Sequence, residues 1–452
     1  MSSLLLSLSL GCLGIYGYLL SKRLTDPHPG ASAYSFKPLP DDELAKLTYP
    51  TPEDMGKAAG PATGKAYVVL GGSGFVGRYI VRTLLARGET LVRNIDIIPP
   101  DLSEGDSSAK DHLSRAEFVQ ADVTDYEAIK QAISRPFGNT GKTAQVIIHT
   151  VAVIRPWERF SYLKHFSHNV NVGGTKNVLK ISQELGTVRA FVFTSSAGTF
   201  LPAAHYLRLT RKHGVVFSED VPDGMPLSHA HYPETKREAD ALVRAADNVK
   251  GIRTGVLRPG MAIAGPGDLW ITFYLKNTGP NVVWGGKASQ TILSPWDLGR
   301  AHVQLADTLE TQPEGVAGTG FAITGQPTAS CLDDMRHVMQ FYCPRDLQFQ
   351  QVPALPLYIL SHFVEAILVI RFYALYGASK LTGAKVSYFP QWALTGNISK
   401  LQPAMWDFGF SDCFIDDSRA RKLLGYRNLW SNEQTLRWAV ETYEGQGNAW
   451  LR

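Results

Sequence analysis

The segment KAYVVLGGSGFVGRYIVRTLL, residues 65–85, constrains the fold of this chain more than any other stretch. Its first part, AYVVL at 66–70, is a short apolar run with β-branched residues, which is typical of a buried parallel strand. After the glycines, apolar residues recur at the spacing of a helix. Because strand, tight turn and helix follow one another so closely, the segment predicts the opening of a βαβ unit.

Three glycines of this turn have separate expected roles. Gly71 makes the tight turn, Gly74 lets a pyrophosphate approach the backbone, and Gly77 lets the helix pack close to the strand. The helix N-terminus then faces the anion. Asp96 follows Gly77 by nineteen residues, at the end of a second apolar stretch, where its carboxylate can accept hydrogen bonds from an adenosine ribose. We therefore predict a dinucleotide site, and the alternative is a glycine turn that binds no ligand.

Further segments of the same kind follow along the chain. Strands are expected at FVQADVTD (118–125), QVIIHTVAVI (145–154) and AFVFTSSAGTF (190–200), with a helix inside 169–182. This alternation predicts an α/β fold with a doubly wound parallel (Rossmann) sheet, whose ligands bind at the carboxyl ends of the strands. Asp122 and Val123 follow one such end and are expected at the adenine edge. Ser195 and Ser196 lie at another.

The segment HYPETKREADALV at 231–243 holds the pair that points most directly to chemistry. Tyr232 and Lys236 are four residues apart, so they share one face of a helix. A tyrosine with its ordinary pKa near 10 is a poor base at neutral pH. A neighbouring ammonium group stabilises the phenolate and lowers that pKa. We therefore expect Tyr232 to accept or donate a proton in the reaction.

The N-terminal residues predict a membrane anchor. Residues 4–20 (LLLSLSLGCLGIYGYLL) are apolar apart from two serines, and Lys22 and Arg23 follow them. The run is at the short edge of what spans a bilayer. Because the positive charges follow the run and no small-residue cleavage site is present, we favour a retained anchor over a secretory leader. The positive-inside rule then puts the rest of the chain in the cytosol.

We accordingly predict a single-pass anchor at 1–23 in the endoplasmic reticulum membrane, and a cleaved or disordered leader is the alternative. Four scattered cysteines fit a reducing compartment. Residues 24–64 are rich in Pro, Gly, Ala and Asp and are predicted to be a linker.

A second apolar stretch, 355–375, is interrupted by His362, Glu365 and Arg371. Each charge at the centre of a bilayer would cost roughly 2.5–3.5 kcal/mol, which disfavours a spanning helix. A helix in the membrane interface, or a cap on an apolar substrate pocket, is one interpretation of this stretch. A buried helix of the C-terminal region is the other.

Several motifs carry a resemblance to a known family. They are GGSGFVG at 71–77, NVGGTKNVL at 171–179, FTSSAGTF at 193–200, YPETK at 232–236 and LRPGMAIAGPGD at 257–268. In these motifs the chain resembles the extended short-chain dehydrogenase/reductases, and among them the 3β-hydroxysteroid dehydrogenase family. The resemblance runs from about residue 65 to about residue 445.

The resemblance implies an oxidoreductase whose catalytic residues are Tyr232, Lys236 and Ser196, with Ser195 as the alternative serine. The implied cofactor is NAD. Besides the glycines, Asp96, Asp122 and Val123, its binding positions fall on Phe75, Val76, Tyr232, Lys236 and Pro259. The implied reaction is oxidation of a 3β-hydroxyl on a sterol or steroid-like substrate to the 3-ketone, with or without loss of a 4α-carboxylate as carbon dioxide.

The predicted division of the chain is an NAD-binding domain at 65–265 and a substrate-binding and C-terminal region at 266–452. The expected partners are a sterol-like substrate and a membrane, and a homodimer is left open. A net charge of +4 without a run of like charges does not imply nucleic acid. No Cys/His cluster in the sequence indicates a metal. Inserted basic residues at positions 208, 211 and 212 fall where we expect substrate specificity to differ within the family.

Two rival functions use the same fold. One is a nucleotide-sugar epimerase or dehydratase, and the other is an NAD-binding protein without activity. A sugar nucleotide is soluble in water and gives no reason for a membrane anchor, whereas a sterol partitions into the bilayer. The intact Ser196, Tyr232 and Lys236 argue against a silent protein.

Overall fold

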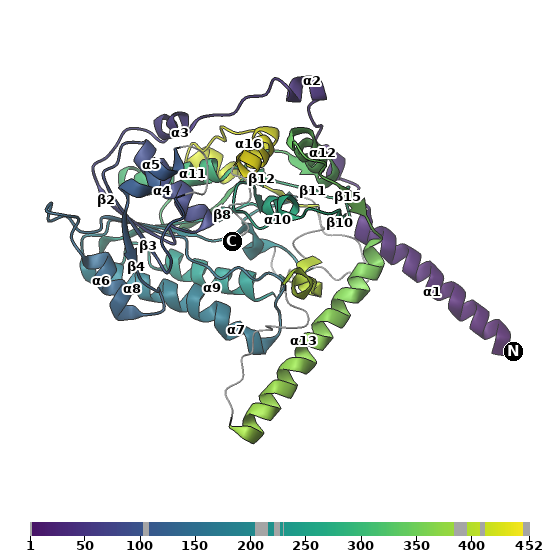
Figure 1. Cartoon of the computed structure of the whole chain (residues 1–452). Coiled ribbons are helices and arrows are strands. Elements are labelled where there is room, and N and C mark those ends of the chain that lie inside the picture. Colours follow the sequence, from purple (N-terminus) through teal and green to yellow (C-terminus); the bar gives the residue numbers. More distant parts are fainter. Residues whose placement is uncertain are drawn as a thin grey trace.

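The computed structural model describes residues 2–102, 108–203, 216–220, 227–228, 230–383, 396–406 and 412–445. The basic residues Arg208, Arg211 and Lys212 lie outside these ranges. A seven-stranded sheet with the order β13-β8-β6-β5-β2-β3-β4 forms the centre of the molecule (Figure 1). Every neighbouring pair of its strands is parallel. The predicted doubly wound Rossmann fold is therefore confirmed.

The strands of this sheet are β2 (Ala66–Leu70), β3 (Leu91–Asp96), β4 (Glu117–Gln120), β5 (Val146–His149), β6 (Ala190–Thr194), β8 (Arg253–Pro259) and β13 (Thr319–Ile323). Strands β2, β5 and β6 are buried along their whole length, because helices cover both faces of a parallel sheet. From β2 the strand order proceeds to β3 and β4 on one side and to β5 on the other. Strands β2 and β5 thus flank the switch point, which is where ligands bind in folds of this kind.

Two layers of helices cover the sheet. The first layer holds α3 (Pro52–Ala58), α4 (Phe75–Ala86), α5 (Ala109–Arg115) and α11 (Pro295–Thr311). The second holds α6 (Tyr126–Ser134), α7 (Ser161–His168), α8 (Thr175–Leu185) and α9 (His231–Ala245). Ile80, Leu84 and Leu305 fill the core on the first face, and Val178 and Val243 belong to the core on the second. The two cores hold the strand ends in fixed positions.

A smaller region is built from the segments around and after β13. Its strands are β9 (Ala262–Ile263), β10 (Asn281–Val283), β11 (Ser289–Gln290), β12 (Ile292–Leu293), β14 (Ala329–Cys331) and β15 (Phe349–Gln351), and β16 (Phe414–Ile415) pairs with β7 (Val216–Phe217). Its helices include α10 (Ile271–Lys276), α12 (Leu332–Tyr342), α15 (Ser418–Leu423) and α16 (Asn432–Gly445). Because β13 and α11 lie after residue 265 and still complete the main sheet and its cover, the sheet is not one continuous segment.

Residues 26–58, which we call the N-terminal strap, are packed against the smaller region and, through α3, against α4 and α11. Within the strap, β1 (Ser35–Phe36) pairs with β14, and α2 (Asp41–Leu44) places Leu44 in the core. Met55 of α3 is also fully buried, and the Tyr49 ring stacks on Trp430 with centroids 5.5 Å apart. In the sequence, these apolar residues are spaced too widely among Pro, Gly and Asp residues to predict a folded segment. Most of the segment expected to be a linker is therefore folded onto the protein.

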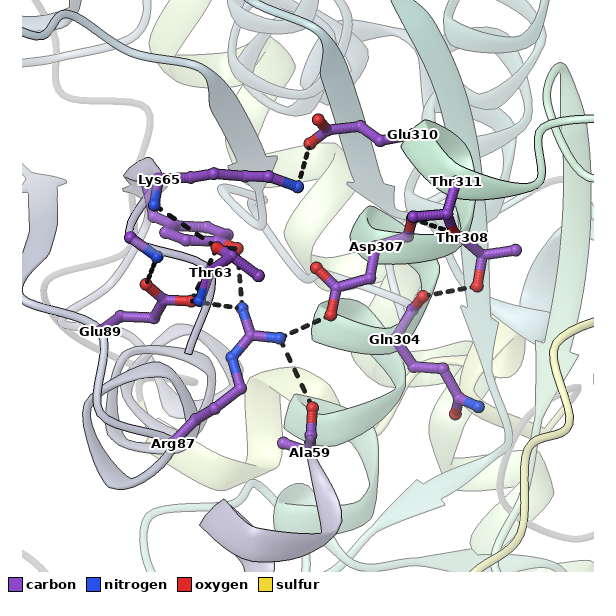
Figure 2. A network of polar contacts seen from close by, with 12 residues as sticks. Ala59, Thr63, Lys65, Arg87, Glu89, Gln304, Asp307, Thr308, Glu310 and Thr311 are labelled. Carbon is purple, nitrogen blue, oxygen red and sulfur yellow. Dashed lines mark hydrogen bonds and ion pairs between the residues drawn. The ribbon is translucent and has the colours of Figure 1, made fainter. Parts of the chain in front are cut away.

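A polar network lies at the end of α4, on the side of the sheet where β2 begins (Figure 2). The Arg87 guanidinium donates to Glu89 at 2.8 Å and to Asp307 of α11 at 2.5 Å. Glu89 in turn accepts from the Thr63 backbone N–H at 2.8 Å. Arg87 and Glu89 have no exposed side-chain surface. Since removal of one member of a buried pair leaves an uncompensated charge, this network fixes the residues before β2, the end of α4 and α11 together.

Two apolar helices extend from the body and meet at one end (Figure 1). They are α1 (Ser2–Thr25) and α13 (Ala354–Thr382), and both are long and apolar enough to cross a membrane by length and composition. Leu24 of α1 packs with Ala354 and Tyr358 of α13 against Trp406. Apolar side chains on α13 face outward, among them Phe363, Ile367, Ile370 and Tyr373.

Candidate active site

The glycine turn joins β2 to α4 as expected. Gly71 has a φ of +82°, a conformation that strongly favours glycine, and its N–H donates to Ile95 at 2.8 Å. A Cβ on Gly77 would lie 2.0 Å from the Gly71 carbonyl oxygen, so only glycine allows α4 to approach the turn this closely. Gly74 begins α4 without a side-chain cap, which leaves the first N–H groups of the helix open to an anion. Phe75 and Val76 follow and are half-buried.

The acids expected at the adenosine end lie after β3 and β4. Asp96 accepts hydrogen bonds from the backbone N–H groups of Ser73 at 3.0 Å and Ile97 at 2.7 Å. The first of these bonds ties Asp96 to the glycine turn, and each carboxylate oxygen keeps a second lone pair. Asp122 is exposed, whereas Val123 is buried against Gly174.

Tyr232 and Lys236 lie in the first turns of α9, facing the end of β6. Ser196, the second residue after β6, lies close enough to the Tyr232 hydroxyl for its side chain to lower the pKa of Tyr232. The Lys236 ammonium donates to the Thr194 carbonyl oxygen at 2.7 Å, and the lysine is 2% exposed. Ser195 is buried as well, and its hydroxyl helps to lower the pKa of Asp240. Of the two serines, Ser196 is therefore the one that contacts Tyr232.

The electrostatics of this pair differ from the sequence-based expectation. Burial raises the pKa of Tyr232 to about 12, and the neighbouring Ser196 side chain offsets this rise only in part. Burial likewise lowers the pKa of Lys236 to about 7, against the charge of Asp240. The expectation that Lys236 lowers the pKa of Tyr232 is thus not met, because Lys236 is directed to the Thr194 carbonyl and the effect of burial on each pKa outweighs the effect of its neighbour.

Three further residues support the pair and were missed from the sequence. Asn171, in the π-helical turn η2 (Asn169–Gly174), donates to the Thr235 hydroxyl at 2.9 Å and bonds both backbone groups of Val153. Thr194 contributes only its carbonyl to Lys236, which no sequence signal predicts. Asp240, one turn after Lys236, accepts two bonds of 2.8 Å from Arg258. Asp240 could have been found from the sequence, because Tyr232, Lys236 and Asp240 follow one another at a spacing of four residues.

The residues present fit a dinucleotide. Gly77 lets α4 pack directly on the glycine turn, and α4 begins without a side-chain cap, so its first N–H groups are open to an anion at that turn. Pro259 ends β8, and Thr194 ends β6 next to it in the sheet. The glycine turn, Asp96, Ser196 and Pro259 thus share the carboxyl edge of one sheet.

Comparison with known proteins gives relatives of one kind and structures with the same fold. The chain is 28% identical to the 3beta-hydroxysteroid-dehydrogenase/decarboxylase isoform 3 of Arabidopsis thaliana, over 61% of this chain and 47% of the relative. It is 27% identical to the sterol-4-alpha-carboxylate 3-dehydrogenase, decarboxylating, of Candida albicans, over 45% of this chain and 53% of that protein. The chain thus spans about half the length of both relatives.

Among solved structures, a UDP-glucose-4-epimerase of Stenotrophomonas maltophila with bound NAD superposes with a TM-score of 0.59. It is 15% identical and covers 85% of this chain and 99% of its own. At this identity the likeness shows the fold alone.

A Rossmann sheet with its glycine turn, and a Tyr-x-x-x-Lys pair at the same edge, define the short-chain dehydrogenase/reductases as the class of this protein. The pair distinguishes the chain from other dinucleotide-binding folds. Within that class, the chain belongs to the 3-beta hydroxysteroid dehydrogenase/isomerase family, whose model matches residues 68–335. It is therefore an oxidoreductase, and its cofactor is NAD.

Proposed function

We propose that this enzyme oxidises the 3β-hydroxyl of a sterol or steroid-like substrate to the 3-ketone. The observation that supports this most is the placement of Tyr232 near Ser196 and of Lys236 on the Thr194 carbonyl, at the carboxyl edge of the sheet in a chain of this family. The glycine turn, Asp96, Asp122, Val123 and Pro259 would hold NAD. When bound, NAD supplies the hydride acceptor and a cationic ring, which favours the phenolate form of a neighbouring tyrosine.

In this proposal, Tyr232 removes the proton of the substrate hydroxyl while Ser196 donates a hydrogen bond that orients it. Lys236, held by the Thr194 carbonyl, keeps a donor next to Tyr232 and would also bond the nicotinamide ribose. The buried surroundings exclude water from the proton transfer. Residues 65–265, together with α11 and β13, would form the NAD-binding part, and the remainder of 266–452 would bind the substrate.

We further propose that the substrate carries a 4α-carboxylate. Oxidation at carbon 3 then gives a β-keto acid. Its carbon dioxide departs because the new carbonyl accepts the electron pair as an enolate, so no separate decarboxylation base is needed. The names of the Arabidopsis and Candida relatives, both of which include decarboxylation, support this assignment.

The test is incubation of the detergent-solubilised full chain with NAD and a panel of 3β-hydroxysterols, with and without a 4α-carboxylate. Ketone formation and carbon dioxide release are followed together. Ketone formation from any of these sterols is the expected result, and release of carbon dioxide identifies the carboxylated substrate. Turnover of UDP-sugars with none of the sterols oxidised would contradict the proposal and favour the epimerase rival.

We predict a preference for NAD over NADP that depends on Asp96. Its carboxylate would bond the ribose hydroxyls and repel a 2′-phosphate. Arg93, the nearby cation in the sequence, is fully buried and bound to Glu117 at 2.8 Å and to the Arg135 carbonyl at 2.6 Å, so it is not available to a phosphate. Asp96→Ala should therefore narrow the ratio of kcat/KM for NAD over NADP. Equal turnover with both cofactors in the wild type, unchanged in the variant, would show the assignment to be wrong.

We also propose that α1 anchors the enzyme in the endoplasmic reticulum membrane, with the catalytic region in the cytosol. The supporting observations are its exposed apolar surface and Lys22 and Arg23 in its last turns. A chain that lacks residues 2–25 should be released by carbonate extraction, whereas the full chain should not. Resistance of the truncated chain would assign the attachment to α13. Modification of a glycosylation site placed near the C-terminus would contradict the orientation.

A further inference from the structure

One carboxylate of the apolar helix α13 is directed into the protein. The Glu365 side chain is 6% exposed, although outward-facing apolar residues such as Phe363 and Ile367 lie on either side of it in the sequence. Its two oxygens accept bonds of 2.7 and 2.6 Å from the Nε and Nη2 atoms of Arg159. This is the bidentate geometry that makes arginine and carboxylate pairs strong.

Arg159 lies in the segment between β5 and α7, which follows the carboxyl end of β5 at the candidate site. The carbonyl groups on either side of Arg159 both contact the same residue. His231 donates its backbone N–H to the Glu158 carbonyl at 2.8 Å, and its Nε2 atom lies 2.5 Å from the Phe160 carbonyl oxygen. His231 is buried, begins α9 and directly precedes Tyr232.

A second contact of another kind joins the same two elements. The Tyr162 ring at the start of α7 stacks on Phe372 of α13, with centroids 3.9 Å apart and planes 13° from parallel. The ion pair and this stack lie about two helical turns apart along α13. Helix α13 thus contacts the segment before α7 at Arg159 and the first turn of α7 at Tyr162. The segment before α7 in turn holds His231, the first residue of the catalytic helix.

We propose that Arg159 and Glu365 are a positioning pair, through which α13 fixes the segment 158–160 and, by way of His231, the first turn of α9 that carries Tyr232. The inference rests on the proposed role of Tyr232. If α13 moves away from this segment, the ion pair between Glu365 and Arg159 is lost. The segment that carries the Glu158 and Phe160 carbonyl groups is then no longer held in place. Turnover therefore depends on the position of α13, although the apolar outer face of this helix is separate from the catalytic centre.

The test is a double-mutant cycle in the full-length protein, with Arg159→Gln, Glu365→Gln and the double variant. Hydrogen exchange of the backbone at 230–236 reports the first turn of α9 without any substrate. Each single variant should exchange roughly tenfold faster there. Oxidation of the 3β-hydroxysterol should lose roughly 10-fold to 100-fold in kcat, since misplacement of a reacting group by about 1 Å has effects of this size. The Kd for NAD should stay unchanged.

The double variant decides whether the two side chains act as a pair. Its hydrogen-exchange rate at 230–236 should be no faster, and its kcat no lower, than those of the single variants. If the effects of the two substitutions multiply instead, the proposal is overturned. Wild-type exchange and kcat in Glu365→Gln would overturn it as well. Lys380→Gln is the matched control on the same helix, where the ammonium lies 5.4 Å from the Tyr376 ring centroid, and it should behave as the wild type. If the wild type oxidises no sterol, the proposed function fails, and the exchange measurement alone still decides the pair.

Discussion

Replacement of Tyr232 by phenylalanine is expected to lower turnover by ~10² to 10⁴, the usual contribution of a proton-transfer residue. The variant loses only the hydroxyl that faces Ser196. Because the glycine turn, Asp96 and Pro259 are untouched, the Kd for NAD should remain that of the wild type. Sterol oxidation followed by NADH absorbance, with NAD binding measured by calorimetry, checks both parts.

Tyr126→Phe is a matched control, since it removes a hydroxyl that donates to Glu184 at 2.8 Å on the surface of α6 and α8. It should retain full turnover. Retention of more than about a tenth of wild-type activity in Tyr232→Phe would show that Tyr232 is not the acid or base.

Replacement of Lys236 by methionine is expected to abolish most turnover and yet to stabilise the protein below pH 7. Burial lowers the pKa of Lys236 to about 7 in the folded chain, compared with 10.5 in the unfolded chain. Between these pH values the unfolded state binds more protons, so wild-type stability rises with pH across this window. Below pH 7 the buried ammonium costs about 5 kcal/mol, at 1.36 kcal/mol for each pKa unit. Methionine removes that cost.

Melting temperatures of both proteins in one detergent, measured between pH 6 and pH 10, test this prediction. The advantage of Lys236→Met should be largest at pH 6 and should shrink toward pH 10. Lys130→Met is the control, because this lysine is 45% exposed and its ion pair with Glu184 is of the surface kind, which contributes little to stability. An advantage of Lys236→Met that is independent of pH would contradict a lowered pKa.

The sequence predicted best those parts of the fold that depend on neighbouring residues. The β2 strand, the glycine turn and α4 are specified by a few consecutive side chains, and so are Tyr232 and Lys236 on one face of α9. The parts that were not foreseen depend on distant residues. Strand β13 joins the main sheet through backbone hydrogen bonds to β8, and such pairing leaves no local pattern that separates it from other short apolar runs.

The pKa values within the site were unpredictable for a related reason. Spacing places Lys236 near Tyr232, but it does not show that Lys236 is buried or that it donates to a backbone carbonyl. The environment of Glu365 in α13 was likewise unpredictable. From the sequence, this residue was expected to be a charge that a spanning helix would place in lipid. In the structure its partner Arg159 lies 206 residues away along the chain, and the carboxylate is withdrawn from the outer surface.

The N-terminal strap has a consequence for the order of events on the ribosome. Ser35 pairs with Ala329, and the backbone N–H of His28 donates to Asp412, so the partners of the strap are made long after the strap itself. At 5–20 residues per second, roughly 15 to 60 seconds separate the emergence of Ser35 from that of its partner. Helix α3 can pack on α4 soon after both emerge, but the part of the strap before α3 has no partner strand during this time, and the Rossmann strands up to β8 can pair without it. That part of the strap therefore reaches its final position among the last.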